Sequence, residues 1–169
     1  MVQWNESILG RNGVRMSKKL VAYISATGVP AKVSNRLAEA IGADVFEIEP
    51  AQAYTQEDLN WQDTNSRSSV EMAKPDARPE IAYRREDMAS FDEVYVGFPI
   101  WWYVAPRIIN TFLESYDLTG KTIIPFATSG GSGMSGVNAS IQASCPGANL
   151  QEGRLLGCDI SLRELSDCF

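Results

Sequence analysis

Three segments of this sequence carry residues suited to binding a ligand, and each follows a short apolar run. In SATGVPA (25–31), two hydroxyls, a glycine and the start of a predicted helix offer hydrogen-bond donors to an anion. In PIWWY (99–103), adjacent aromatic side chains diverge, which leaves at least one able to stack on a flat ligand. In SGGSG (129–133), the glycines permit a ligand to approach the backbone closely.

Each segment also has a purely structural interpretation, which the residues leave open. Hydroxyls between a strand and a helix commonly cap the helix. The aromatic residues of 99–103 can pack beneath the polar segment 51–90 or form a contact between subunits. The glycine-rich segment 129–133 can be a plain turn. Convergence of the three segments at one place would favour a phosphorylated flat cofactor.

The composition excludes several kinds of chemistry. The chain has no histidine, which removes histidine-dependent triads, histidine metal sites and the usual general base. It has no P-loop lysine motif and no GxGxxG fingerprint, so nucleoside triphosphates and dinucleotides fit poorly. A net charge of -6 argues against nucleic acid and suits steering onto a basic partner. We therefore expect a bound cofactor to do the chemistry, with no catalytic side chain and no metal.

Cysteine usage and hydropathy indicate the cellular compartment. The three cysteines form no CxxC pair and are typical of reduced, structural thiols. No apolar run approaches the ~20 residues that span a bilayer. The first residues also lack the apolar core and cleavage site of a signal peptide. These features predict a cytoplasmic protein that does not bind a membrane.

The length of 169 residues predicts one domain. Met16 directly precedes the first apolar run, so residues 1–15 are interpreted as an N-terminal extension and 16–169 as the domain. The polar stretch 51–90 is longer than one connecting helix requires, which indicates a functional lid or a decorated connection.

Apolar runs alternate with amphipathic segments along the whole domain. This alternation predicts an α/β fold with an open parallel sheet and right-handed crossovers. The three ligand-binding segments all follow strands, so they converge at the carboxyl edge of the sheet, where ligands bind in such folds. The predicted strands lie at 20–25, 43–50, 92–102 and 153–160, and a further strand in 120–134 runs into the glycine-rich loop. The predicted helices lie at 31–41, 66–73, 105–117, 136–145 and 161–169.

The sequence resembles the flavodoxin family over residues 17–160, most closely the bacterial flavodoxin-like proteins with GFPIWW and TSGGSG loops. The first loop of that family reads Ser/Thr-x-Thr-Gly-x-Thr, which Ser25, Thr27 and Gly28 match. The resemblance implies a three-layer sandwich, with a five-stranded parallel sheet of order 2-1-3-4-5 and noncovalent FMN at one end.

The resemblance also implies roles for the three segments: the first cradles the FMN phosphate, the second lines the isoalloxazine ring, and the third approaches its pyrimidine edge. Trp101 or Trp102 is the implied stacking partner. The implied cofactor-binding residues are Ser25, Ala26, Thr27, Gly28, Val29, Pro30 and Ala31; Pro99, Ile100, Trp101, Trp102 and Tyr103; and Ser129, Gly130, Gly131, Ser132 and Gly133.

The sequence departs from the family pattern at two places. Pro30 stands where the family usually has threonine, and it lacks both an N–H and a hydroxyl, although it suits the first turn of a helix. The C-terminal helix is shortened, because 161–169 allows only about two turns. We therefore expect part of one sheet face to be covered by the N-terminal extension or by a second subunit, as in a homodimer.

The favoured function is an FMN-binding electron carrier that serves a basic reductase or acceptor. One alternative is an NAD(P)H-dependent FMN or quinone reductase of the same fold, whose substrate pocket is built by Tyr54, Trp61 and Arg67. Another is a degenerate module that no longer holds FMN, for which Pro30 and the shortened C-terminus are the support. Enzymatic activity is left open, with the carrier favoured.

Overall fold

A computed structural model of the chain describes residues 17–128 and 133–169. Its parallel sheet has the order β2-β1-β3-β4-β5, which confirms the predicted α/β topology. A short sixth strand, β6, also pairs with β4. The predicted extension, 1–15, lies outside the described residues. The strands are β1 Lys19–Tyr23, β2 Asp44–Glu47, β3 Glu93–Pro99, β4 Thr122–Thr128, β5 Asn149–Leu150 and β6 Arg154–Leu155.

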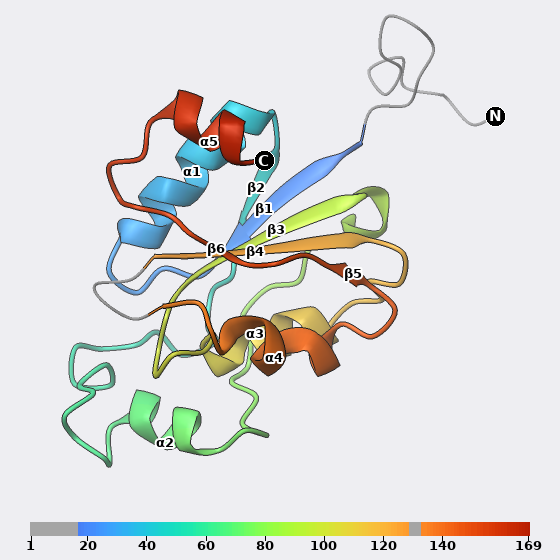
Figure 1. Ribbon diagram of the computed structural model, residues 1–169. Helices are drawn as coiled ribbons and strands as arrows, with labels where there is room; N and C mark the ends of the chain where they lie inside the picture. Colours follow the sequence, from blue (N-terminus) through green and yellow to red (C-terminus); the bar gives the residue numbers. More distant parts are fainter. Residues whose placement is uncertain (1–16, 129–132) are drawn as a thin grey trace, which may run out of the picture.

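Helices cover both faces of the sheet (Figure 1). Helices α1 and α5 lie on one face and α3 and α4 on the other, whereas α2 lies beyond α3 and α4 at the periphery. No helix in the described part of the chain is long and apolar enough to cross a membrane. The helices are α1 Val29–Ile41, α2 Arg67–Ala73, α3 Arg107–Glu114, α4 Val137–Ile141 and α5 Leu162–Cys168, with 3₁₀ turns at Met88–Ser90 and Gln142–Ser144.

The central strands are apolar on both faces, because each face packs against helices. Alternate residues of β1 separate into two cores: Leu20 and Ala22 face α3 and α4, and Val21 faces α1. Val21 is in register with Tyr95, and both are buried in the second core. The carboxyl ends of β1 and β3 are thereby fixed side by side, with the loops that follow them at one edge.

The C-terminal helix packs on its sheet face despite its seven residues. The expected cover by a second subunit stays a prediction, and the N-terminal extension lies outside the described residues. A capping box starts α5, in which Ser161 and Glu164 exchange hydrogen bonds. Leu165 is fully buried, and the Phe169 ring meets the Tyr95 ring edge-on at 5.3 Å. Tyr95 consequently keeps only 2% of its surface exposed.

The strand predicted at 153–160 is only partly correct, because two short strands occupy the fifth position. The ladder to β4 stops after Leu150 and resumes at Arg154. Pro125 of β4 lies within this gap, and a proline cannot donate to a ladder. The Asn138 side chain spans the gap instead, donating to the Gln151 carbonyl at 2.8 Å and accepting from the Gly153 N–H at 3.0 Å.

Several other predicted elements are shorter in the structure than in the sequence interpretation. The second strand ends at Glu47 rather than at residue 50. The helix predicted over 105–117 begins after Pro106, which occupies its N-cap, and ends at Glu114. The helix predicted over 136–145 tightens into a 3₁₀ turn after Ile141. Pro146 follows this turn, and a proline so placed prevents the helix from continuing.

Candidate cofactor-binding site

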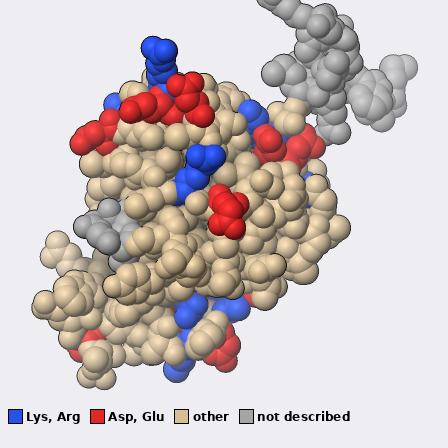
Figure 2. All heavy atoms as spheres, viewed as in Figure 1, with Lys and Arg blue, Asp and Glu red and all other residues tan. Residues whose placement is uncertain are grey.

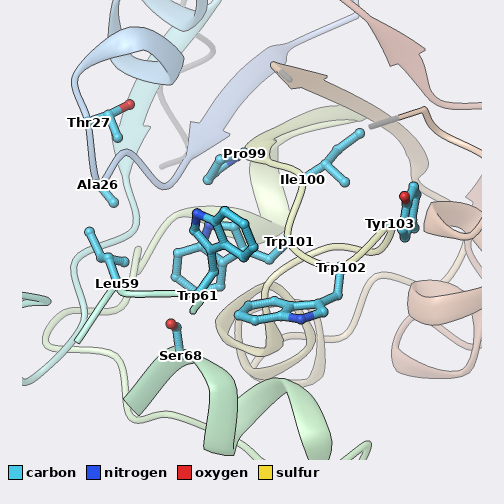
Figure 3. Close-up of a pocket in the computed structure, with 10 residues that line it drawn as sticks. All are labelled: Ala26, Thr27, Leu59, Trp61, Ser68, Pro99, Ile100, Trp101, Trp102 and Tyr103. Carbon is cyan, nitrogen blue, oxygen red and sulfur yellow. The ribbon is translucent and has the colours of Figure 1, made fainter. Parts of the chain in front are cut away.

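A pocket of about 640 Å³ opens at the carboxyl edge of the sheet. Its walls come from the loop after β1, the loop after β3, and the segment that leads into and begins α2 (Figure 3). This volume lies within the range of ordinary small-molecule sites. The lining residues are Ala26, Thr27, Leu59, Trp61, Ser68, Pro99, Ile100, Trp101, Trp102 and Tyr103.

The loop after β1 presents unused backbone donors at the start of α1. The Ser25 hydroxyl accepts the Gly28 N–H at 3.0 Å, which shapes the turn. Gly28 has φ 89°, a conformation that favours glycine, and no side chain caps the helix. The N–H groups of Val29 and Ala31 have no acceptor among the described residues. Together with the positive end of the helix dipole, they form an environment that favours an anion.

The loop after β3 is a tight hairpin turn around two aromatic residues. Trp101 and Val104 exchange two backbone hydrogen bonds of 3.0 and 3.1 Å. Both central residues have positive φ, 49° at Trp102 and 66° at Tyr103, which is the type I′ arrangement. Bulky residues adopt this conformation at a cost of roughly 1–2 kcal/mol each. The turn exposes 44% of Trp102 and 63% of Tyr103 at the surface.

Gly136 allows the chain before α4 to support this strained turn. A Cβ at Gly136 would lie 2.8 Å from the Tyr103 carbonyl oxygen, which is closer than real contacts of this kind. Glycine is therefore the residue that lets the two backbones meet. The turn at Trp102 and Tyr103 thus packs against Gly136, which lies outside the three ligand-binding segments.

Trp101 also lines the pocket, and its ring is held by the polar segment 51–90. Its ring meets Tyr54 edge-on at 5.4 Å. The Tyr54 hydroxyl donates to Glu71 at 2.6 Å, and the Arg67 guanidinium lies 4.0 Å above the Tyr54 ring while pairing with Glu71 at 2.8 Å. Burial, and secondly the bond to Glu71, raise the pKa of Tyr54, which therefore stays protonated. Trp101 therefore packs against the 51–90 segment while it also lines the pocket, whereas Trp102 and Tyr103 stay exposed.

Ser68 contributes a buried hydroxyl without a partner. It is 2% exposed, and its oxygen has no hydrogen bond among the described residues. Figure 3 shows the side chain on α2 pointing toward the pocket. A buried hydroxyl left unpaired is costly, so a polar ligand atom at this position would satisfy it.

The structure gathers part of the predicted residue set. Ala26, Thr27 and the whole of 99–103 line the pocket. Ser25 lines a smaller neighbouring pocket of about 230 Å³, which shares Ala26. Gly28, Val29, Pro30 and Ala31 line neither pocket, and the Pro30 ring is buried in the first turn of α1. Gly133 is exposed and lines neither, whereas Ser129, Gly130, Gly131 and Ser132 lie outside the described residues.

Two lining residues were missed in the sequence, and a third was assigned only to the reductase alternative. Leu59 and Ser68 carry no motif, and Trp61 was named as part of a substrate pocket rather than of the cofactor site. The usable signal was the length of 51–90, which exceeds that of a plain connection.

The pocket walls are uncharged although the protein is acidic. None of the ten lining residues is a lysine, arginine, aspartate or glutamate. Figure 2 shows charged side chains of both signs gathered over α1 and α5 and again at the lower edge of this face. Aromatic, uncharged walls suit a flat ring, and the charge of an anion is met by backbone dipoles at α1.

The fold and the site define a class: an α/β protein with a ligand crevice at the carboxyl edge of a parallel sheet. The family model described as Flavodoxin matches residues 18–169. The chain therefore belongs to the flavodoxin family. No curated protein matches it closely enough to count as a relative.

Two solved structures resemble this chain in sequence as well as in fold. A candidate flavoprotein from Bacteroides eggerthii is 46% identical, with a TM-score of 0.86 over 90% of this chain and 96% of that one. A candidate flavoprotein from Bacteroides uniformis is 48% identical, with a TM-score of 0.85 over 90% and 97%. A flavoprotein from Lactobacillus acidophilus, solved in complex with FMN, is 20% identical, with a TM-score of 0.67 over 85% and 95%, and it shares the fold.

Proposed function

We propose that this protein binds FMN and carries electrons between redox partners. Membership of the flavodoxin family supports FMN as the cofactor. The observation that carries the proposal is one uncharged, aromatic pocket of about 640 Å³ whose wall includes the anion-favouring loop before α1. This combination fits a ligand with a ring at one end and a phosphate at the other.

The residues present fit the cofactor. Thr27 and the N–H groups of Val29 and Ala31 would hold the phosphate, because they are donors without acceptors among the described residues. Trp102 of the β3–α3 turn and Trp61 would flank the ring, and the orphaned hydroxyl of Ser68 would donate to a polar ring atom.

The protein itself would hold the cofactor, orient its ring and shield the ring from water. FMN supplies one- and two-electron chemistry when bound, so no side chain has to act as acid or base. The Trp101–Tyr54–Glu71 chain of contacts fixes the pocket wall, and Tyr54 keeps its proton across the ordinary pH range. The apolar walls exclude water from the ring, which is one of the means by which proteins tune a cofactor.

The surface charge supports a basic redox partner. A net charge of -6 attracts a positively charged reductase or acceptor at long range. We place this exchange in the cytoplasm, where the three unpaired cysteines would stay reduced.

Titration of the apoprotein with FMN tests the proposal. We expect quenched flavin fluorescence, a bound-flavin visible spectrum and reversible reduction. A Trp101→Ala, Trp102→Ala double variant should bind FMN at least about tenfold more weakly, because the ring loses aromatic contact worth over 1 kcal/mol. Tyr83→Ala is the control, since Tyr83 is 64% exposed and lines no described pocket.

Two results would redirect the assignment. Steady-state oxidation of NADH or NADPH by the purified holoprotein would identify a reductase rather than a carrier. Absence of any fluorescence change at saturating FMN would identify a module that no longer holds the cofactor.

A further inference from the structure

A hollow of about 310 Å³ lies at the amino edge of the sheet, away from the candidate cofactor pocket. Glu93 and Thr122 begin β3 and β4 side by side, and both line it. The short helix α5 ends at Cys168, and Phe169 meets Tyr95, so the amino ends of these strands stay open. The lining residues are Glu93, Tyr95, Thr122, Ile124, Gln151, Glu152, Arg154, Cys168 and Phe169.

Two polar groups in this hollow lack hydrogen-bond partners. Tyr95 is only 2% exposed, and its hydroxyl makes no hydrogen bond among the described residues. The Oε2 atom of Glu93 is buried and also unsatisfied, since the Lys19 ammonium lies 3.9 Å away, beyond hydrogen-bond distance. Glu93 and Tyr95 stand two residues apart on β3, so their side chains share one face. Buried polar atoms are normally paired, so both oxygens are suited to accept hydrogen bonds from a ligand.

Arg154 supplies a cation on the β6 side of the hollow. Its guanidinium lies 5.5 Å from the centre of the Phe169 ring and forms no ion pair or side-chain hydrogen bond within the described part of the chain. The hollow therefore has acceptors on its β3 side and a guanidinium on its β6 side. This arrangement complements a zwitterion, whose ammonium would meet the acceptors and whose carboxylate would meet Arg154.

The wall that α5 contributes includes a thiol. Cys168 is the last residue of α5, is half-buried and forms no disulfide. Cys158 is also unpaired and is more exposed, but it lines none of the pockets found among the described residues. Access alone thus favours reaction at Cys158, whereas only Cys168 has groups beside it that could recognise what becomes attached.

We propose that Cys168 is a modification site that forms a mixed disulfide with a small amino-acid thiol of the cysteine type, whose zwitterionic head lies in the hollow. The Cys168 thiolate attacks one sulfur of the disulfide form of the small thiol. A new S–S bond forms to Cys168 and the original S–S bond breaks. The departing thiolate takes up the proton that Cys168 lost, so Cys168 is oxidised and the departing half is reduced.

The position of this equilibrium follows the ratio of small disulfide to small thiol. Cys168 would therefore stay free in a reducing cytoplasm and become modified when that ratio rises. The hollow shares no residue with the candidate cofactor pocket, so the modification does not depend on bound FMN.

Exchange with cystine tests the inference on the full chain, with intact mass and peptide mapping as the readouts. In a cysteine–cystine buffer, the equilibrium constant for the mixed disulfide should be at least about tenfold larger at Cys168 than at Cys158, because charged hydrogen bonds hold the adduct. With 2-hydroxyethyl disulfide, which leaves an uncharged group, the two constants should agree within about twofold. Equal constants with cystine, or a preference for Cys168 that is the same with both disulfides, would overturn the inference.

Two variants test the recognition groups. Glu93→Gln and Arg154→Gln should each lower the cystine constant at Cys168 at least about fivefold, because each removes one charged partner of the zwitterion. The matched control is Glu39→Gln, an exposed position on α1 that lines none of the described pockets, and it should leave the constant unchanged. Constants that stay at the parent value in both Glu93→Gln and Arg154→Gln would show that the hollow does not recognise the adduct and would refute the proposal.

Discussion

The unpaired hydroxyl of Ser68 makes a sharp test at the scale of a single residue. In Ser68→Ala, FMN affinity should fall about 2–10-fold, because a hydrogen bond worth roughly 0.5–1.5 kcal/mol is lost. The apoprotein should keep or gain thermal stability, because a buried unsatisfied group is removed. Fluorescence titration and thermal melting measure the two effects.

Ser34→Ala supplies the control for this test. Ser34 is also a fully buried hydroxyl without a described partner, but it lies on α1 and does not line the pocket. Its removal should change apoprotein stability in the same direction and leave FMN affinity unchanged. Equal FMN affinities in Ser68→Ala and the parent protein would show that Ser68 does not contact the cofactor.

Because Pro30 has no backbone N–H, the first turn of α1 lacks one donor, and replacing Pro30 with another residue restores this N–H. Pro30→Thr should bind FMN about tenfold more tightly. A hydrogen bond to a charged phosphate is worth roughly 1.5–3 kcal/mol, and part of this is spent on rearranging the loop. The apoprotein should lose about 0.4–1 kcal/mol of stability, since proline restricts the unfolded chain. Pro30→Ala restores the N–H without the hydroxyl and separates the two donors; no gain in either variant would mean that the phosphate lies elsewhere.

At the scale of elements, α5 makes alkaline stability depend on Tyr95. Burial raises the pKa of Tyr95 to about 12 from its ordinary 10.0, with Glu93 adding to the shift. Above pH 10 the unfolded chain therefore loses this proton while the folded protein keeps it, so stability falls as pH rises toward 12. Tyr95→Phe should reduce the loss of Tm between about pH 8 and pH 11. Tyr83→Phe changes an exposed position and should leave the loss of Tm over this pH range unchanged.

The order and kind of the main elements could be predicted because hydrophobic periodicity is local. Runs such as 92–102 and the helical spacing in 31–41 depend only on neighbouring residues, and β3 and α1 formed there. The loops after β1 and β3 converge because strand direction follows from the crossover rule. The same reasoning therefore predicts which residues of these loops reach the pocket, such as Thr27 and Trp102.

The remaining features arise from contacts between distant segments. The break between β5 and β6 depends on Pro125 lying opposite it and on the Asn138 side chain, which the residues of 149–155 do not encode. The positive φ of Trp102 contradicts its local preference and is held by tertiary contact at Gly136. Ser68 entered the site because α2 folded against the β3–α3 turn, and no motif marks that contact.

At the scale of the whole molecule, the net charge of -6 predicts that electron transfer to a basic partner depends on salt. Electron transfer from the reduced holoprotein to cytochrome c, a basic acceptor, should slow at least about tenfold between low salt and 1 M, where the screening length shrinks to ~3 Å. Stopped-flow absorbance measures the rate, and a salt-independent rate with cytochrome c would contradict acidic steering.

The interrupted fifth position of the sheet has a consequence for self-association. A sheet margin normally offers a row of unpaired amides to an incoming strand. Here β5 and β6 each present only two residues, with Gly153 drawn toward Asn138 between them. The opposite margin, β2, has four residues, of which the first and last are Asp44 and Glu47. Neither margin offers a template long enough to nucleate fibrillar stacking. By breaking the ladder, Pro125 also protects the protein from joining copies of itself through its sheet.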